Sequence, residues 1–315
     1  MGKASRTKVE STRREKIAAQ RAAERRAEKR RRILLAAGSV IVVLAVVLTF
    51  VIIKLNSKPP SSSSAPNGPT GSALTALVNT VTSVPASTLD AVGSGGGAIT
   101  NLPIKINGTA LTANGKPEML YMGAEYCPYC AAERWAMIVA LSRFGTFTGL
   151  TTIHSAAVDG AGSSEPYPNT PTFTFAHATY SSPYLTFTPV EMNTNIPDPS
   201  SGSYTTLQTP TAAQQALISK FDNQPYISSS EPAGSIPFIY FGGKAMIVGT
   251  SVAQNEAISG LDWNQIAADL HNPNSAVAKA EDGEANYITA AICKMTGNQP
   301  ASACTATVQA LESQL

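Results

Sequence analysis

Two cysteines separated by two residues lie where a predicted strand passes directly into a predicted helix. The apolar run at residues 119–123 predicts a buried strand, and residues 128–143 predict a helix. Pro128 falls in the first turn of that helix, where its missing backbone N–H costs nothing. Cys127 and Cys130 therefore stand at the start of a helix that follows a buried strand. We expect an α/β fold, because a buried strand and an adjoining helix must pack on one another.

The position of the two thiols predicts redox chemistry. Cys127 faces the unsatisfied N–H groups and the positive end of the helix dipole, which stabilise a thiolate, the nucleophilic form of cysteine. Cys130 lies one turn further on and can attack a mixed disulfide formed on Cys127. We therefore expect Cys127 to be the catalytic nucleophile and Cys130 to be the resolving thiol.

Two other uses of this cysteine pair are weaker. Zinc binding needs about four ligands. The chain offers three histidines and a second cysteine pair whose spacing is unlike a zinc knuckle, so we expect no metal. A structural Cys127–Cys130 disulfide would close a very small loop and stabilise little. It stays open as an alternative.

An apolar run of 21 residues, Ile33 to Ile53, carries no charge. As a helix it would span roughly 31 Å, enough for the hydrocarbon core of a bilayer, which is about 30 Å thick. Residues 1–32 carry 13 Lys and Arg against 4 Asp and Glu, which predicts a cytoplasmic N-terminus. We expect a single-pass cell-membrane protein with an uncleaved signal anchor. The alternative is a cleaved signal peptide, for which residues 61–65 offer a site.

The anchor divides the rest of the chain into a linker and one domain. Residues 54–72 are rich in Pro and Ser, which predicts a flexible linker. Residues 73–315 are expected to form an extracytoplasmic domain that is helical from about residue 262. The basic residues form one terminal block instead of a stripe over a folded face, so we expect no nucleic-acid partner.

The second cysteine pair, Cys293 and Cys304, encloses ten residues at a predicted helix–turn–helix. Outside the cytoplasm, the default for such a pair is a structural disulfide, which contributes roughly 3 kcal/mol for a loop of this size. The alternative is a second redox pair that relays electrons to the first.

Periodicity and turn residues place the remaining elements. Trp135 and Met137 are expected in the core, whereas Glu133 and Arg134 are expected to be solvated, though either could tune Cys127. Residues 195–203 predict a polar loop, within a segment (193–223) that either caps the site partly or elaborates the scaffold. Strands are predicted at 104–106, 151–154, 172–175, 184–191 and within 234–249, and helices at 73–81, 212–221, 262–271, 274–295 and 303–315.

Residues 124–130, Ala-Glu-Tyr-Cys-Pro-Tyr-Cys, resemble the active-site turn of the thioredoxin superfamily, and the Pro-Tyr pair is typical of glutaredoxins. Ile236-Pro237, which opens a strand–turn–strand, resembles the cis-proline loop of that superfamily. The resemblance implies a three-layer α/β/α domain, here with insertions and a C-terminal helical extension after one transmembrane helix. It also implies that substrate is bound by residues on both sides of the thiols: Tyr126, Pro128, Tyr129, Ile236 and Pro237.

The chain departs from that superfamily at two positions. Thioredoxins carry a buried acid six residues before the first cysteine, where this chain has Tyr121. Strongly oxidising extracellular members carry His between the cysteines, where this chain has Tyr129. The chain as a whole resembles an uncharacterised family of membrane-anchored bacterial and archaeal proteins known as a domain of unknown function. The segments that carry this likeness are 123–143, 184–191 and 288–304.

We therefore expect a membrane-anchored thiol–disulfide oxidoreductase that acts on the thiols and disulfides of exported proteins. It would need no cofactor, and its partners would be an unidentified redox protein and the lipid bilayer. Two alternatives are kept. One is a non-catalytic binding or scaffold protein with a thioredoxin fold, and the other is a reductase for cytochrome maturation.

Overall fold

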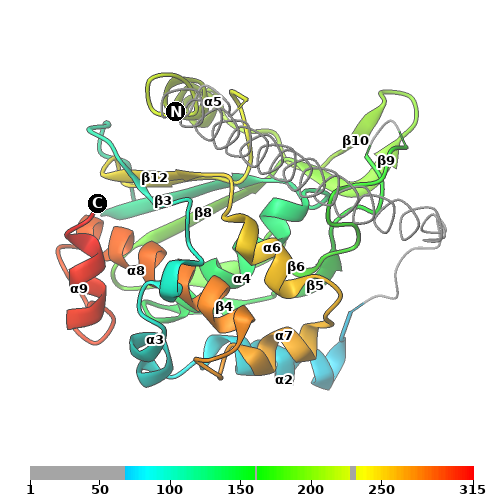
Figure 1. Cartoon of the computed structure of the whole chain (residues 1–315). Coiled ribbons are helices and arrows are strands. Elements are labelled where there is room, and N and C mark those ends of the chain that lie inside the picture. The colour runs from blue at the N-terminus through cyan, green and yellow to red at the C-terminus, as the bar shows by residue number, and fades with distance from the viewer. Residues whose placement is uncertain (1–67, 160–161, 228–231) are drawn as a thin grey trace, which may run out of the picture. The chain divides into compact units, whose positions relative to one another are not determined.

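The computed structural model describes residues 68–159, 162–227 and 232–315 (Figure 1). The predicted cytoplasmic segment and membrane helix, residues 1–53, lie outside these ranges, as does most of the predicted linker. Within the described ranges, no helix is long and apolar enough to cross a bilayer.

The fold is mixed α/β and is centred on a six-stranded sheet. Its strand order is β1–β12–β11–β3–β2, and β8 pairs with β3 in parallel, whereas the other pairs are antiparallel. The bounds of these strands are β1 Ile104–Lys105, β2 Thr112–Ala113, β3 Lys116–Gly123, β8 Thr186–Glu191, β11 Phe238–Phe241 and β12 Ala245–Val248.

Three two-stranded sheets and a set of helices complete the described residues. The small sheets pair β4 (Thr146–Thr148) with β7 (Thr179–Ser181), β5 (Thr151–His154) with β6 (Pro171–Thr174), and β9 (Asn193–Asp198) with β10 (Ser203–Thr206). The α-helices are α2 Gly71–Thr82, α3 Ala86–Val92, α4 Pro128–Ser142, α5 Ala212–Phe221, α6 Val252–Ile258, α7 Trp263–Asp269, α8 Gly283–Thr296 and α9 Ala306–Glu312. A 3₁₀ turn, η1 (Gly95–Gly97), and a π-helical segment, η2 (Ala278–Asp282), are also present.

The centre of the sheet is buried on both faces, because β11, β12 and residues 119–123 of β3 are apolar and buried. Met119 and Tyr121 of β3 pack with α4 and α8, whereas Leu120 and Met122 pack with α5 on the opposite face. This alternation follows from the two-residue period of a strand. Figure 1 shows the result, with α5 on one side of the sheet and α4 and α8 on the other.

Helix α4 is enclosed on every side. Each residue from Cys130 to Leu141 is buried, so the prediction that Trp135 and Met137 lie in the core is confirmed. The prediction that Glu133 and Arg134 are solvated is wrong, because both are fully buried. A helix covered by a sheet and by helices from the C-terminal part of the chain has no solvent face on which to place charged residues.

Most predicted elements are present, although α3, α6, β4 and β7 were not predicted and three predicted segments differ. The predicted polar loop at 195–203 is instead the β9–β10 hairpin, where Ser203 pairs with Asp198. The domain begins earlier than residue 73, because Gly68 is buried and Thr152 donates a hydrogen bond to the carbonyl of Pro69 (3.0 Å). The predicted helix at 303–315 is limited to α9, which begins after its N-cap, Thr305.

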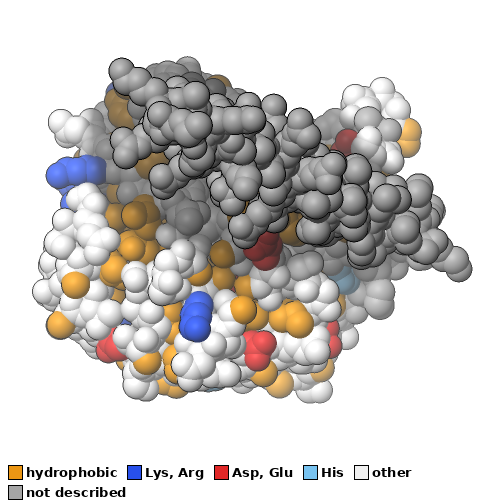
Figure 2. Space-filling view, viewed as in Figure 1, with side chains coloured by type: hydrophobic (Ala, Val, Ile, Leu, Met, Phe, Trp, Pro, Cys, Tyr) orange, Lys and Arg blue, Asp and Glu red, His pale blue; other side chains and the backbone are white. Residues whose placement is uncertain are grey.

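Charged side chains are few on the face of the molecule that Figure 2 shows. Figure 2 shows Lys, Arg, Asp and Glu side chains scattered over the face in view, with no extended basic patch among the described residues there.

Four carboxyl groups lie in the interior behind α4. Glu133 of α4 lies near Glu281 of η2 and Glu284 of α8, Asp282 of η2 lies near Glu281, and all four are at most 1% exposed. Gln254 of α6 donates hydrogen bonds to Glu133 (3.2 Å) and Glu281 (3.5 Å). Both carboxyl oxygens of Asp282 and of Glu284 have no hydrogen-bond partner in the described part of the chain, and none of the four carboxyls is ion-paired there.

Burial without a cation favours the neutral form of these carboxyls. Burial raises the pKa of Glu133 to about 8 and that of Asp282 to about 8, and it also raises the pKa of Glu281 and of Glu284. Among the described residues, no cluster of three or more metal-binding side chains has the arrangement of a metal site. Burial therefore favours the protonated form of all four carboxyls.

This cluster predicts that the protein loses stability as pH rises. A carboxyl whose pKa is raised in the folded state contributes stability below its unfolded pKa, near 4.3, and loses it as pH approaches 8. We expect the free energy of unfolding, measured with urea on the full chain, to fall by several kcal/mol between pH 5 and pH 9. Glu284→Gln should flatten this dependence, whereas the exposed control Glu256→Gln should leave it unchanged. An equal slope in all three proteins would contradict the prediction.

Candidate functional site

The two cysteines meet at the junction of β3 and α4. Cys127 is the N-cap of α4 and its backbone is extended (φ −71°, ψ 120°), while Pro128 occupies the first helical position. The backbone N–H of Cys130 donates a hydrogen bond to Cys127 Sγ (3.2 Å). An unsatisfied helix N–H thus points at the first sulfur, as expected for an N-cap that carries negative charge.

The two sulfurs differ in access to solvent. Both thiols are free, but Cys127 is 4% exposed whereas Cys130 is 0% exposed. Both residues are therefore buried, and Cys127 is the more exposed of the two. This is the difference expected between a nucleophile and a resolving thiol.

A loop from the other end of the chain closes over the first sulfur. Cys127 Sγ lies 3.8 Å from the carbonyl oxygen of Ile236, and the Ile236–Pro237 peptide bond is cis. Pro237 is buried, and its carbonyl accepts a hydrogen bond from the N–H of Gly249 (2.8 Å), which fixes the loop to the end of β12. The structure therefore brings Ile236 and Pro237 to the thiols, 109 residues downstream of Cys127.

Tyrosines surround the thiols. Tyr126 stacks on Tyr204 of β10, with ring centroids 4.0 Å apart, and Tyr129 meets Tyr167 edge-on at 6.2 Å. Tyr126, Tyr129 and Ile236 are half-buried and pack against Cys127 and Cys130. Three of the predicted substrate residues, Tyr126, Tyr129 and Ile236, thus form one surface, whereas Pro128 and Pro237 are buried beneath it.

The β9–β10 hairpin belongs to this surface. Besides its contact with Tyr126, Tyr204 donates a hydrogen bond from its hydroxyl to the carbonyl of Val158 (2.6 Å). The N–H of Glu125 donates to the carbonyl of Asn193 (2.9 Å). Tyr204 was not predicted as a site residue, because it directly follows the predicted polar loop at 195–203, in the segment 193–223 for which a partial cap and a scaffold role both stayed open. The alternation of Tyr204 with polar neighbours was the one signal of a strand.

The pKa values of the two thiols are shifted in opposite directions. Burial raises the pKa of Cys127, but hydrogen bonds from the thiol and the N–H of Cys130 and the charge of Arg134 outweigh burial and leave that pKa below its usual value. For Cys130, burial and the hydrogen bond that its thiol donates to Cys127 raise the pKa well above its usual value. The pair therefore holds one proton on Cys130 and favours a thiolate on Cys127.

The charge that lowers the pKa of both thiols belongs to Arg134. Its Nε and Nη2 donate to the two carboxyl oxygens of Glu191 (2.9 and 2.7 Å), and Nη2 also donates to the carbonyl of Ala124 (2.7 Å). Both charged side chains are fully buried. The suggestion that Arg134 could tune Cys127 from the first turns of the helix fits this position, but it acts from the interior instead of from solvent.

A hydrogen bond from α6 also supports the turn. Asn255 donates from Nδ2 to the carbonyl of Pro128 (2.9 Å), between the two cysteines. Asn255 is buried, and nothing in its sequence context indicated a role near residues 127–130.

The second cysteine pair forms a disulfide, which confirms that pairing. Cys293 of α8 and Cys304, just before α9, are joined with their Cα atoms 5.8 Å apart, and both are buried in the main core. Cys127 and Cys130 belong to a separate, smaller cluster of buried residues. The disulfide therefore links the two C-terminal helices without packing against the dithiol.

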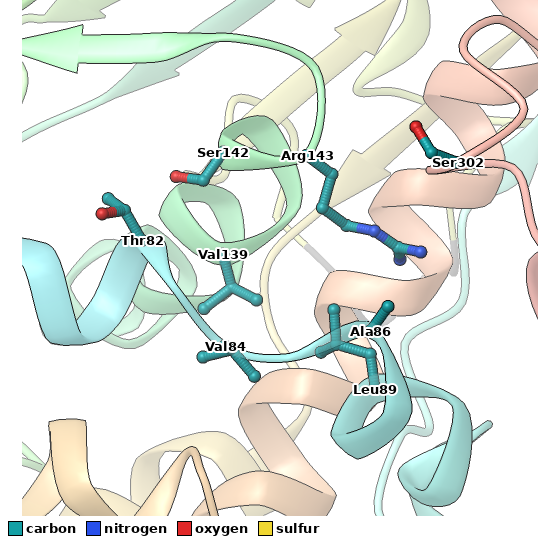
Figure 3. Close-up of a pocket in the computed structure, with 8 residues that line it drawn as sticks. All are labelled: Thr82, Val84, Ala86, Leu89, Val139, Ser142, Arg143 and Ser302. Carbon is teal, nitrogen blue, oxygen red and sulfur yellow. The ribbon is translucent and has the colours of Figure 1, made fainter.

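A cavity of about 180 Å³ opens at the opposite end of α4 and contains neither thiol (Figure 3). Arg143 reaches into it, but donates to the carbonyl of Ala303 (2.7 Å). The hydroxyls of Thr82 and Ser142 donate to helix carbonyls and present only acceptor oxygens. Because Arg143 already donates a hydrogen bond to the protein and the two hydroxyls offer only acceptor oxygens, the cavity is not suited to binding an anion. The lining residues are Thr82, Val84, Ala86, Leu89, Val139, Ser142, Arg143 and Ser302.

Residues 102–294 match the family described as Domain of unknown function (DUF929). The chain belongs to this family. No curated protein and no solved structure matches the chain. The matched residues of this DUF929 protein include Cys127, Cys130 and the Ile236–Pro237 loop, but end before Cys304.

The buried ion pair predicts the reactivity of Cys127. Replacing Arg134 and Glu191 together by Met removes both charges, so neither is left unpaired in the interior. The pKa of Cys127 should rise, because Arg134 stabilises its thiolate, and the alkylation rate at pH 7 should fall by a factor of a few. The rate of iodoacetamide labelling against pH measures this, with Arg143→Met as the matched control. An unchanged profile in the double variant would show that Arg134 does not act on Cys127.

In this DUF929 protein, we expect the Cys293–Cys304 disulfide to stabilise the fold and to take no part in thiol exchange. Replacing Cys293 and Cys304 together by Ala should lower the free energy of unfolding by about 3 kcal/mol, since the disulfide restricts the unfolded chain. Urea unfolding measures that change, and thiol exchange with glutathione disulfide should keep its rate. Loss of exchange in a variant that remains folded would instead favour a relay between the two pairs.

Proposed function

We propose that this protein is a thiol–disulfide oxidoreductase with a thioredoxin-like domain, in which Cys127 attacks and Cys130 resolves. The observation that carries the proposal is the hydrogen-bonded dithiol at the start of α4. The N–H and the thiol of Cys130 both stabilise Cys127 Sγ as a thiolate, and Cys127 is the more exposed of the two buried cysteines, at 4% against 0%. A low-pKa thiol with a resolving thiol beside it is the arrangement that disulfide exchange needs.

The arrangement of the sheet supports the thioredoxin-like part of the proposal. β3 and β8 are parallel and joined through α4, and β11 and β12 form an antiparallel pair beside β3. Helices cover both faces of these four strands. Such a three-layer domain, with the dithiol at the end of a central strand, is what the resemblance of residues 124–130 implies.

The surroundings of Cys127 support a peptide or protein as the substrate. Tyr126, Tyr129 and Ile236 form a half-buried apolar rim, and the carbonyl of Ile236 faces the sulfur. Aromatic side chains with polar tips suit a surface that binds protein chains. Within this proposal, Pro128 and Pro237 shape the turn and the loop that hold this rim in place.

The proposal also includes the cellular context. Residues 33–53 would anchor the protein in the cell membrane, and the domain would face the exterior, where exported proteins form disulfides. The disulfide between Cys293 and Cys304 supports an oxidising surrounding, because such bonds are rare in the cytoplasm.

Trapping of an intermediate tests the proposed function. In the full chain, Cys130→Ser should accumulate a mixed disulfide on Cys127 after addition of glutathione disulfide, because the resolving sulfur is absent. Mass spectrometry of the intact protein detects that adduct. In the reduced wild type, Cys127 should be alkylated first, with a pH midpoint below the 8.5 of a free thiol.

Cys127→Ser is the matched control and should form no adduct at residue 127 or at the buried Cys130. If Cys130→Ser accumulates no mixed disulfide, or if Cys127 is alkylated no faster than a free thiol, then the cysteines serve a binding or scaffold protein.

A further inference from the structure

Tyr121 carries a buried hydroxyl that the fold alone does not explain. The residue lies on β3, paired with Ile239 of β11 and Pro189 of β8, and is 0% exposed. Its hydroxyl has no hydrogen-bond partner within the described residues. An unsatisfied buried polar group lowers stability, so a native structure that keeps one calls for a functional reason.

This hydroxyl lies beside the resolving sulfur. A Cβ atom placed on Gly123 would overlap the Tyr121 hydroxyl and would lie 3.1 Å from Cys130 Sγ. The Tyr121 hydroxyl and Cys130 Sγ therefore both lie close to the position that a Cβ atom of residue 123 would occupy. Because Gly123 has no side chain, nothing attached to that residue separates the phenol from the thiol.

Arg134 adds positive charge to this region. Its guanidinium lies 6.0 Å from the centre of the Tyr121 ring, and Arg134 Nη1 has no hydrogen-bond partner in the described part of the chain. Glu191 holds the guanidinium in place through its other nitrogens. Two buried donors without acceptors, Tyr121 Oη and Arg134 Nη1, thus lie in the region behind the dithiol.

Cys130 is the group that needs such donors. Its thiol must lose a proton before it can attack, although burial favours the protonated form. In the dithiol state, its proton is directed to Cys127 Sγ. Once Cys127 is bonded to a substrate sulfur, Cys127 no longer holds the negative charge that this hydrogen bond stabilised.

We propose that the Tyr121 hydroxyl donates a hydrogen bond to the thiolate of Cys130 and so assists the resolving step. This role rests on the proposed function and deepens it. Tyr121 keeps its proton throughout, and the charge of Arg134 adds to the stabilisation of the thiolate.

The reaction balances with a disulfide as the oxidant. The Cys127 thiolate attacks one sulfur of the substrate disulfide, and the other sulfur leaves as a thiolate that takes the proton of Cys130. Cys130 then attacks Cys127 Sγ, the bond between Cys127 and the substrate breaks, and the second substrate thiolate is protonated by water. The substrate gains two electrons, and Cys127 and Cys130 become a disulfide.

Tyr121→Phe tests this role because it removes only the hydroxyl. Glutathione disulfide is mixed with the reduced full chain, samples are quenched with acid, and mass spectrometry follows the mixed disulfide on Cys127. The lifetime of the adduct should lengthen about tenfold or more in Tyr121→Phe, since one hydrogen bond to a charged group is lost. The rate of adduct formation should stay the same.

Two further measurements separate this role from a structural one. Tyr240→Phe removes a buried-ring hydroxyl from the neighbouring strand, where it donates to the carbonyl of Thr109 (3.0 Å), and should leave the adduct lifetime unchanged. The pH dependence of resolution should move to higher pH in Tyr121→Phe only, whereas its stability to urea should be retained.

The outcomes distinguish the two proposals. A wild-type protein that forms neither the adduct nor a Cys127–Cys130 disulfide overturns the proposed function and this role with it. A wild-type protein that forms and resolves the adduct, together with a Tyr121→Phe variant that resolves it equally fast, overturns the role of Tyr121 alone.

Discussion

The ion pair between Arg134 and Glu191 joins the three parts of the fold that position the dithiol. Arg134 belongs to α4, Glu191 ends β8, and the carbonyl of Ala124 lies in the turn that leads to Cys127. A buried charge that loses its partner costs about 3–5 kcal/mol. Helix, strand and turn are therefore held in one arrangement, and the geometry at Cys127 depends on it.

Helix α4 separates two interior regions of different electrostatic character. Towards the thiols, the buried cation of Arg134 favours negative charge on sulfur. Behind the helix, Glu133 and three further carboxyls from η2 and α8 have no ion-pair partner among the described residues, and burial favours their protonated form. Glu133 and Arg134 are adjacent on one helix. Burial favours the neutral form of Glu133, whereas Arg134 keeps its charge in an ion pair with Glu191.

Local patterns predicted the elements that hold the site, but not the contacts that tune it. The strand before Cys127, the helix after it and the strand after Pro237 each follow from periodicity and turn residues within a short window. The burial of Arg134 and the approach of Tyr204 depend on segments 57 or more residues away, which cover α4 and the turn. No window of the sequence contains that information, because solvation of a helix face is decided by what packs against it.

The position of Tyr121 limits which residues can replace Gly123 during evolution. Any side chain at residue 123 would meet the phenol hydroxyl and crowd Cys130 Sγ. The two positions are therefore not independent: as long as a tyrosine stands at 121, selection should hold glycine at 123. Among relatives, a larger residue at 123 should occur together with a smaller one at 121. Covariation between residues 121 and 123 would then show that the combined volume of the two side chains is limited.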